Sequence, residues 1–224
     1  MSDISLNEKI LSFLIVNYRY ASGIGLMHGK MGGVLFFSLY AQHTGLAMYE
    51  KYAKMLMEDI YREINDVTPI NFATGLCGIG WGIEYLIQNK LICGDPDEIL
   101  ADIDNKIMEH SPLRIKDYSL EKGLGGILFY VNTRIKSYER KIPFDVRFLE
   151  ELKMKINTLS SVNQFVLENI KDFNGIMSGH VDYQTSVAFP DFLFGEILKQ
   201  IGNISDCPLG IYKGLTGYLL KDLL

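Results

Sequence analysis

The chain lacks the features that mark several classes of protein. It has only three cysteines, Cys77, Cys93 and Cys207, which form no CxxC motif and cannot all pair with one another. We therefore expect no disulfide framework. We expect a reducing, cytoplasmic location. The net charge of -5, from 22 basic and 27 acidic residues, comes without a basic block. Because binding to nucleic-acid phosphates needs clustered positive charge, we expect no nucleic-acid partner.

Segments typical of export or of membrane insertion are also missing. The N-terminus reads MSDISLNEKI, with acidic residues where a signal peptide would be positively charged. The densest apolar run, at 10–16, is interrupted by Ser12 and is far shorter than the ~20 residues that span a bilayer. Alternation typical of strands is scarce, and its best example is at 165–167. We therefore predict an all-α chain without a membrane span.

A short glycine motif repeats along the chain. Four segments contain Gly-x-x-Gly followed by apolar residues, and their leading glycines are Gly29, Gly75, Gly123 and Gly214. The first three are almost evenly spaced, whereas the last interval is roughly twice as long as the others. This spacing predicts a degenerate copy inside the long interval, and the candidate is 175–179.

Two kinds of helix are expected to alternate between these motifs. The first kind follows a motif directly, as at 34–41, and is apolar nearly all round, so it should be buried on more than one side. The second kind, at 49–64, 96–109 and 144–159, is amphipathic, with apolar residues spaced by three and four. Asp95 and Pro96 predict a helix N-cap and first helical residue.

This alternation fits two architectures, an open superhelical solenoid and a closed α/α toroid. Glycines at i and i+3 favour the toroid, because inner helices crowded around one axis need small residues for close approach of their backbones. We therefore predict that 1–224 forms a single α/α toroid domain of about five helical hairpins.

The glycine segments resemble the successive motifs of the LanC-like proteins, the lanthionine synthetase C family. The segments are LMHGKMGGVLFFSLYAQHTG, FATGLCGIGWGIEYLIQNKLI, LEKGLGGILFYV and LGIYKGLTGYLL. The resemblance implies an α/α toroid and a role in modifying ribosomally made peptides. It also implies that about five hairpins are few for the family ring. Either they close a smaller ring, or the open flank is covered by a second subunit or a partner.

Active members of this family use zinc to bind the thiol of a peptide cysteine. The thiolate, which zinc coordination generates, adds to a dehydroalanine or dehydrobutyrine, and a general acid protonates the resulting enolate. The family ligands are two cysteines and a histidine, in Cys-His-Gly and Trp-Cys-Tyr-Gly motifs. Neither motif occurs here, and Cys93 lies in a connection without a tryptophan. We therefore predict no metal site, with zinc kept as the minor alternative.

Three further residues are candidates for the site. His28 matches the His-Gly-x-x-Gly form of the family's active-site repeats, which implies a catalytic acid or base; the alternative is a histidine that caps a turn. Cys77 stands at the mouth of an inner helix and is a candidate ligand-binding residue, or else a small core hydrophobe. His180 lies near the degenerate motif and is a candidate ligand-binding residue or an ordinary loop histidine.

Lysines accompany three of the glycine turns. Lys30, Lys122 and Lys213 lie in or beside them, where helix N-termini carry partial positive charge. Together they would make an opening that attracts an anion such as a peptide carboxylate. The alternative is that they are solvated turn residues.

Four functions remain open at this point. The leading hypothesis is a zinc-free peptide-binding or accessory protein of a lanthipeptide-type system, whose partner is a peptide or a protein and which forms homo-oligomers if its ring is open. The second is an active cyclase with an atypical zinc set drawn from His28, Cys77, His180 and Cys207. The third is a carbohydrate-handling toroid, which needs two carboxylates, with Glu84 and Glu121 as the nearest candidates. The fourth is a purely structural interaction module.

Overall fold

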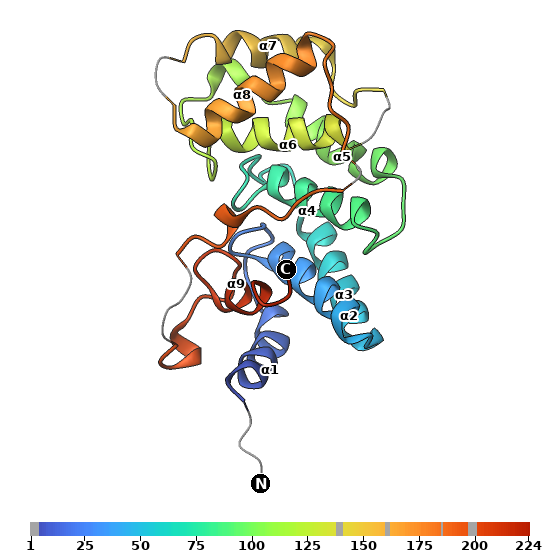
Figure 1. The fold of residues 1–224 in the computed structure, drawn as a ribbon, viewed down its shortest axis with the longest axis vertical. Helices are drawn as coiled ribbons and strands as arrows, with labels where there is room; N and C mark the ends of the chain where they lie inside the picture. The colour runs from blue at the N-terminus through green and yellow to red at the C-terminus, as the bar shows by residue number, and fades with distance from the viewer. Residues whose placement is uncertain (1–4, 138–140, 160–161, 185, 197–200) are drawn as a thin grey trace. The chain divides into compact units, whose positions relative to one another are not determined.

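The computed structural model describes residues 5–137, 141–159, 162–184, 186–196 and 201–224 (Figure 1). Over these residues the chain is helical and contains no strand, so the all-α prediction is confirmed. In the same part of the chain, no helix is long and apolar enough to cross a membrane. The contacts divide the chain into two compact units. The first unit comprises Met1–Thr68 and Phe189–Leu224, and the second comprises Pro69–Ala188.

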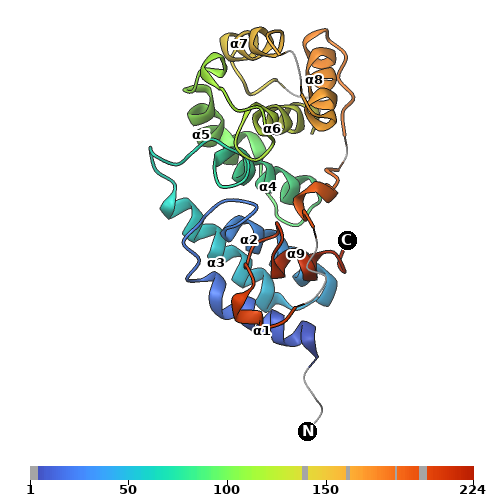
Figure 2. The same cartoon turned by 90° about the vertical axis from the view of Figure 1, so that its left-hand side faces the viewer.

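The first unit is built around one buried helix. Helix α2 (Lys30–Thr44) packs along α3 (Ala47–Glu63), and it also contacts α1 (Leu6–Tyr18) and α9 (Leu215–Leu220), as Figure 2 shows. Every residue of α2 from Lys30 to Leu39 is buried. Two short 3-10 helices, Asp191–Leu193 and Ile204–Asp206, lie in the segment that leads to α9. α2 is therefore an inner helix of the kind that the apolar pattern predicts.

The second unit has the same alternation of buried and half-exposed helices. Helix α4 (Leu76–Gln88) contacts both α5 (Pro96–Met108) and α6 (Leu124–Lys136), and α6 packs against α8 (Gln164–Met177). Helix α7 (Val146–Ile156) packs against the 3-10 helix Pro112–Arg114. The strand-like residues at 165–167 lie within α8, which shows that so short an alternation carries no strand signal.

The amphipathic helices bury the faces that their sequences predict. The residues of α3 that are buried are Ala53, Leu56 and Ile60, at spacings of three and four. The start of α5 is also as predicted, since the side chain of Asp95 accepts a hydrogen bond from the Asp97 N–H at 2.9 Å and Pro96 is the first helical residue.

The predicted degenerate glycine motif at 175–179 is wrong. Gly175 lies in the last turn of α8, and Gly179 follows the helix with a φ of +82°. Helix α8 begins instead at Asn163, whose side chain accepts a hydrogen bond from the Val166 N–H at 2.9 Å. These glycines therefore belong to the end of a helix and open none.

Candidate functional site

The four glycine motifs form one kind of loop. In each, the leading glycine is the N-cap of an inner helix and has an extended backbone, with φ between −123° and −130°. The first N–H of a helix has no acceptor within the helix. Here it donates to the carbonyl oxygen seven residues earlier, and the pairs are Lys30 to Gly23 (2.8 Å), Leu76 to Pro69 (2.8 Å), Leu124 to Asp117 (3.0 Å) and Leu215 to Pro208 (2.8 Å). We call these segments, 23–29, 69–75, 117–123 and 208–214, the helix-opening loops.

The glycines are required because each loop folds back onto its own helix. A Cβ added at Gly32 would lie 2.7 Å from the Leu26 carbonyl oxygen, and one at Gly126 would overlap the Leu120 carbonyl oxygen. A Cβ at the N-cap Gly75 would overlap the carbonyl oxygen of Pro69. The expectation that Gly-x-x-Gly lets neighbouring inner helices approach each other is therefore corrected. The motif lets the backbone of a loop approach the first turn of the helix that it opens.

The residue before the N-cap glycine is exposed in all four helix-opening loops. These residues are His28, Thr74, Lys122 and Lys213. Their side chains stand where the sequence analysis places its candidate site, at the mouths of the inner helices. His28 and Lys213 belong to the first unit, and Lys122 belongs to the second.

In the first unit, the structure brings His28 and Lys213 to the same aromatic ring. The Tyr212 N–H donates to the Met27 carbonyl at 3.1 Å, which ties the two helix-opening loops together. The His28 and Tyr212 rings meet edge to face, with 5.6 Å between centroids. The Lys213 Nζ lies 5.4 Å from the Tyr212 ring centroid. We call His28, Tyr212 and Lys213 the Tyr212 cluster.

The backbone of Lys213 is held in an uncommon conformation. Its φ of 52° lies in the left-handed region, which residues other than glycine rarely adopt. Its N–H donates to the Phe194 carbonyl at 2.9 Å, and a Cβ added at the adjacent Gly195 would lie 2.8 Å from the Tyr212 ring. The segment that precedes α9 therefore fixes both Tyr212 and Lys213. Sequence reasoning singled out Lys213 but missed Tyr212, although an aromatic residue beside it was a usable signal.

The other candidate lysine of the first unit, Lys30, is not exposed as Lys213 is. Lys30 is only 5% exposed, and its ammonium forms an ion pair with Glu63 of α3. Its charge is therefore neutralised inside the protein. Lys122 of the second unit is exposed, as is Lys213.

The candidate zinc ligands have different environments. Cys77 is fully buried, and its burial, with the nearby Asp104 carboxylate, raises the pKa of its thiol well above the ordinary value. His180 is exposed and follows α8, where its backbone N–H donates to the Gly175 carbonyl at 2.9 Å. His28 and Cys207 lie in the first unit, whereas Cys77 and His180 lie in the second. In the described part of the chain, no three His, Cys, Asp or Glu side chains are grouped so as to hold a metal ion.

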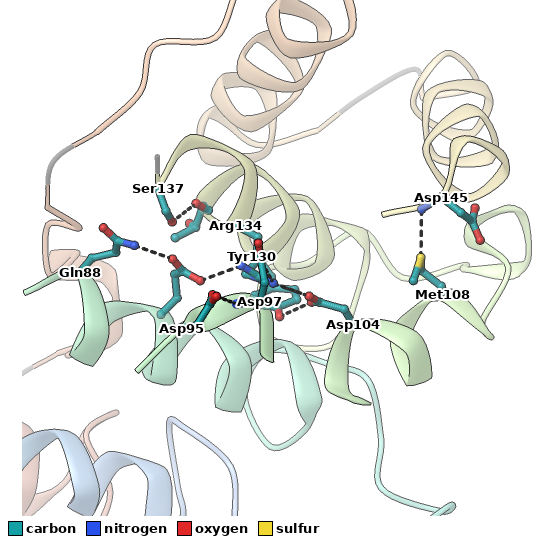
Figure 3. A network of polar contacts seen from close by, with 11 residues as sticks. Gln88, Asp95, Asp97, Asp104, Met108, Tyr130, Arg134, Ser137 and Asp145 are labelled. Carbon is teal, nitrogen blue, oxygen red and sulfur yellow. Dashed lines mark hydrogen bonds and ion pairs between the residues drawn. The ribbon is translucent and has the colours of Figure 1, made fainter. Parts of the chain in front are cut away.

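The second unit contains a buried network of charges centred on Arg134 of α6 (Figure 3). The guanidinium is fully buried and pairs with Asp104 of α5 at 2.6 Å and with Glu84 of α4 at 3.2 Å. It also pairs with the part-exposed Asp97 at 3.2 Å. The Tyr130 hydroxyl donates to Asp104 at 2.5 Å. The network therefore joins α4, α5 and α6 through one cation and three carboxylates.

The pKa values in this network follow from burial and from charge. Burial alone would lower the pKa of Arg134, but Tyr130, Asp104 and Glu84 raise it above the ordinary value. Burial raises the pKa of Tyr130 well above its ordinary value, and the neighbouring Asp104 carboxylate adds to this effect. Arg134 is therefore charged and Tyr130 neutral at any physiological pH.

Of the two carboxylates considered for a carbohydrate enzyme, Glu84 is not presented to solvent. Glu84 is fully buried in the network, where it pairs with Arg134 and accepts a hydrogen bond from Gln88 at 3.0 Å. Glu121 is half-buried in a helix-opening loop, and its carbonyl accepts a hydrogen bond from the Ala73 N–H at 2.9 Å. Glu84 therefore stabilises the fold through its ion pair. It lies in the middle of α4 and not at a helix mouth.

One cavity adjoins the charged network. It has a volume of about 280 Å³ and is lined by Asp97, Ala101, Asp104, Asn105, Lys141, Ile142 and Pro143. Lys141 places a positive charge beside the two carboxylates, so the lining is of mixed sign. The cavity is a side feature of the network and holds none of the candidate site residues.

Comparison with family models, with curated proteins and with solved structures finds no match to this chain.

Proposed function

We propose that this chain is a LanC-like protein of a lanthipeptide-type peptide-modification system, and that it binds a peptide without the help of zinc. The observation that carries the proposal is the repeated helix-opening loop. Four inner helices begin in the same way, with the same backbone hydrogen bond and an exposed residue before the glycine. A surface that repeats along the chain in this way suits an extended ligand such as a peptide.

We propose in addition that the hairpins belong to an α/α toroid. Two consecutive pairs support this architecture, because the inner helices α2 and α4 each pack against the amphipathic helix that follows them, α3 and α5. An incomplete ring would leave apolar inner-helix surface that a partner protein or a second copy covers.

The residues present do not fit the zinc site that the family resemblance implies. Zinc needs three or four ligands in a tetrahedral arrangement, with cysteine bound as thiolate. The buried Cys77 is held in its thiol form, and the described residues provide no group of three ligands. The proposed function is accordingly peptide binding or an accessory role, and His28 acts in it as a contact residue of the helix mouth.

The test is binding of a synthetic peptide rich in Ser, Thr and Cys, followed by fluorescence anisotropy. We expect the same affinity with added zinc and with a chelator, because no step of binding uses a metal. A peptide of equal length and charge made of Gly and Asn is the control, and it should bind more weakly. Absence of binding contradicts the proposal. Zinc-dependent loss of the free thiol, in a peptide that also carries dehydroalanine, would show an active cyclase instead.

A further inference from the structure

The Tyr212 cluster joins two helix-opening loops of the first unit. His28 and Lys213 come from loops that lie at opposite ends of the chain, and both side chains reach the same ring. The corresponding exposed residues of the second unit are Thr74 and Lys122, which follow Ala73 and Glu121 in place of an aromatic residue. In the first unit, two helix-opening loops therefore meet at one aromatic ring, whereas in the second unit the ammonium of Lys155, from α7, lies 5.3 Å from the ring of Tyr118 in the loop 117–123.

The charge environment of Lys213 differs from that of Lys30 and Lys136. No carboxylate among the described residues forms an ion pair with its ammonium, in contrast to Lys30, which pairs with Glu63, and Lys136, which pairs with Asp172. The contact with the Tyr212 ring orients the ammonium, while the ammonium stays exposed. An ammonium that is both oriented and exposed can pair with an anionic ligand.

The position of the cluster is fixed by the backbone. Tyr212 donates to the Met27 carbonyl, Lys213 donates to the Phe194 carbonyl, and the left-handed φ of Lys213 sets the direction of its side chain. Gly210 lies so close to His28 that a Cβ there would be 2.8 Å from the His28 Cα. The three side chains are thus held on a rigid support, which lowers the entropic cost of binding.

We infer that the Tyr212 cluster binds a carboxylate group of the peptide; this inference rests on the proposed function. The Lys213 ammonium donates to the carboxylate oxygens, and the His28 ring packs against Tyr212 and supports it. The half-exposed Tyr212 ring contacts the apolar part of the residue that carries the carboxylate. A carboxylate of this kind is supplied either by the C-terminus of a peptide or by an acidic side chain.

The experiment compares three forms of one synthetic Ser-, Thr- and Cys-rich peptide. One form has a free C-terminal carboxylate, one has a C-terminal amide, and one has the amide together with an internal glutamate. We expect the wild-type protein to bind at least one carboxylate form about tenfold more tightly than the plain amide, and this ratio should shrink as salt is added. The form that gains affinity identifies the source of the carboxylate.

Two variants make the test specific to the cluster. Lys213→Gly removes the ammonium and accepts the left-handed backbone, so the fold should be kept, and a thermal unfolding curve checks this. Lys54→Ala removes an exposed ammonium of α3, outside the helix-opening loops, and is the control for net charge. Lys213→Gly should abolish the preference for the carboxylate form, whereas Lys54→Ala should leave it unchanged.

The possible results separate the inference from the proposed function. If the wild-type protein binds acid and amide forms equally, the carboxylate inference is wrong and peptide binding stands. If both lysine variants lose the preference to the same extent, the effect is one of net charge and the inference is overturned. If no form binds, both the proposed function and the inference fail.

Discussion

At the scale of single residues, the helix-opening loops show that a glycine can be required by contact alone. Gly126 lies in α6, where its φ needs no glycine, but the loop carbonyl of Leu120 and the side chain of Phe72 occupy the place of a Cβ. A glycine inside a helix otherwise costs about 0.5–1 kcal/mol relative to alanine. The chain accepts that cost here because any larger residue would push the loop away.

The first prediction concerns Gly126→Ala. The added Cβ overpacks the contact between loop and helix, so the variant should lose about 1–3 kcal/mol of unfolding free energy. Gly175→Ala is the control in the same unit, because Gly175 is also helical and its nearest neighbouring atom would lie 3.4 Å from the new Cβ. That variant should be neutral or slightly more stable than wild type. Equal unfolding midpoints in urea for both variants would contradict the loop contact.

Arg134 shows, also at the scale of the residue, that buried carboxylates need a buried cation to compensate their charge. Arg134→Met should cost about 3–5 kcal/mol, since it leaves Glu84 and Asp104 buried without their partner. Arg147→Met breaks the ion pair between Arg147 and Glu151 on α7. The side chain of Arg147 is 87% exposed. The loss there should stay below about 1 kcal/mol.

The free energy of unfolding of both arginine variants can be measured in urea. A third variant identifies the cause of the loss of stability in Arg134→Met. Adding Glu84→Gln to Arg134→Met removes one of the uncompensated charges, so it should restore part of the lost stability. If the double variant is less stable than Arg134→Met alone, packing of the arginine stem dominates and the electrostatic explanation is wrong.

At the scale of the element, the shared feature is the way in which an inner helix begins. The first N–H of a helix normally faces water and exchanges fast. In α2, α4, α6 and α9 it is bonded to the loop carbonyl seven residues earlier. The first N–H groups of α7 and α8, at Val146 and Gln164, have no acceptor in the described part of the chain.

Hydrogen exchange should therefore distinguish the two kinds of helix start. We expect the amides of Lys30, Leu76, Leu124 and Leu215 to exchange at least about tenfold more slowly than those of Val146 and Gln164, after correction for sequence. Exchange resolved by NMR measures each amide separately. Equal rates in both sets would show that the loops open freely and that their hydrogen bonds contribute little.

The elements were also the part of the structure that the sequence predicted best. Periodicity identified the buried face of α3 and the start of α5, because both depend on residues within one or two turns. The degenerate motif failed for a local reason: glycine is strongly enriched directly after the end of a helix, which is where Gly179 lies. A glycine that opens a helix differs from a glycine that follows one in the apolar run after it. No apolar run follows Gly179.

The candidate site could be predicted only in part, because its contacts span the chain. His28 and Lys213 were found from their places beside the glycines, but the ring that unites them, Tyr212, meets His28 through packing of distant segments. Likewise, Lys30 carries the same charge as Lys213 in the sequence, and only the fold pairs it with Glu63. Spacing gives a residue's position in its loop, whereas its partner depends on tertiary packing.

At the scale of the whole molecule, the environments of the candidate zinc ligands lead us to predict a protein that works without zinc. A zinc site needs several ligands that converge on one point. The described residues contain no group of three such ligands, and Cys77 is fully buried whereas His180 is exposed. The raised pKa of Cys77 adds to this, because the thiolate is the form that binds zinc.

Protein purified without chelator should therefore contain well under one zinc per chain in elemental analysis. Its thermal unfolding midpoint should not change when a chelator is added, since removing a metal that binds the folded state would lower its stability. Cys77→Ala supplies the control, and it should alter stability only through the small loss of packing volume. Stoichiometric zinc that disappears in Cys77→Ala would require the buried thiol to ionise, and it would favour an active cyclase over the peptide-binding function.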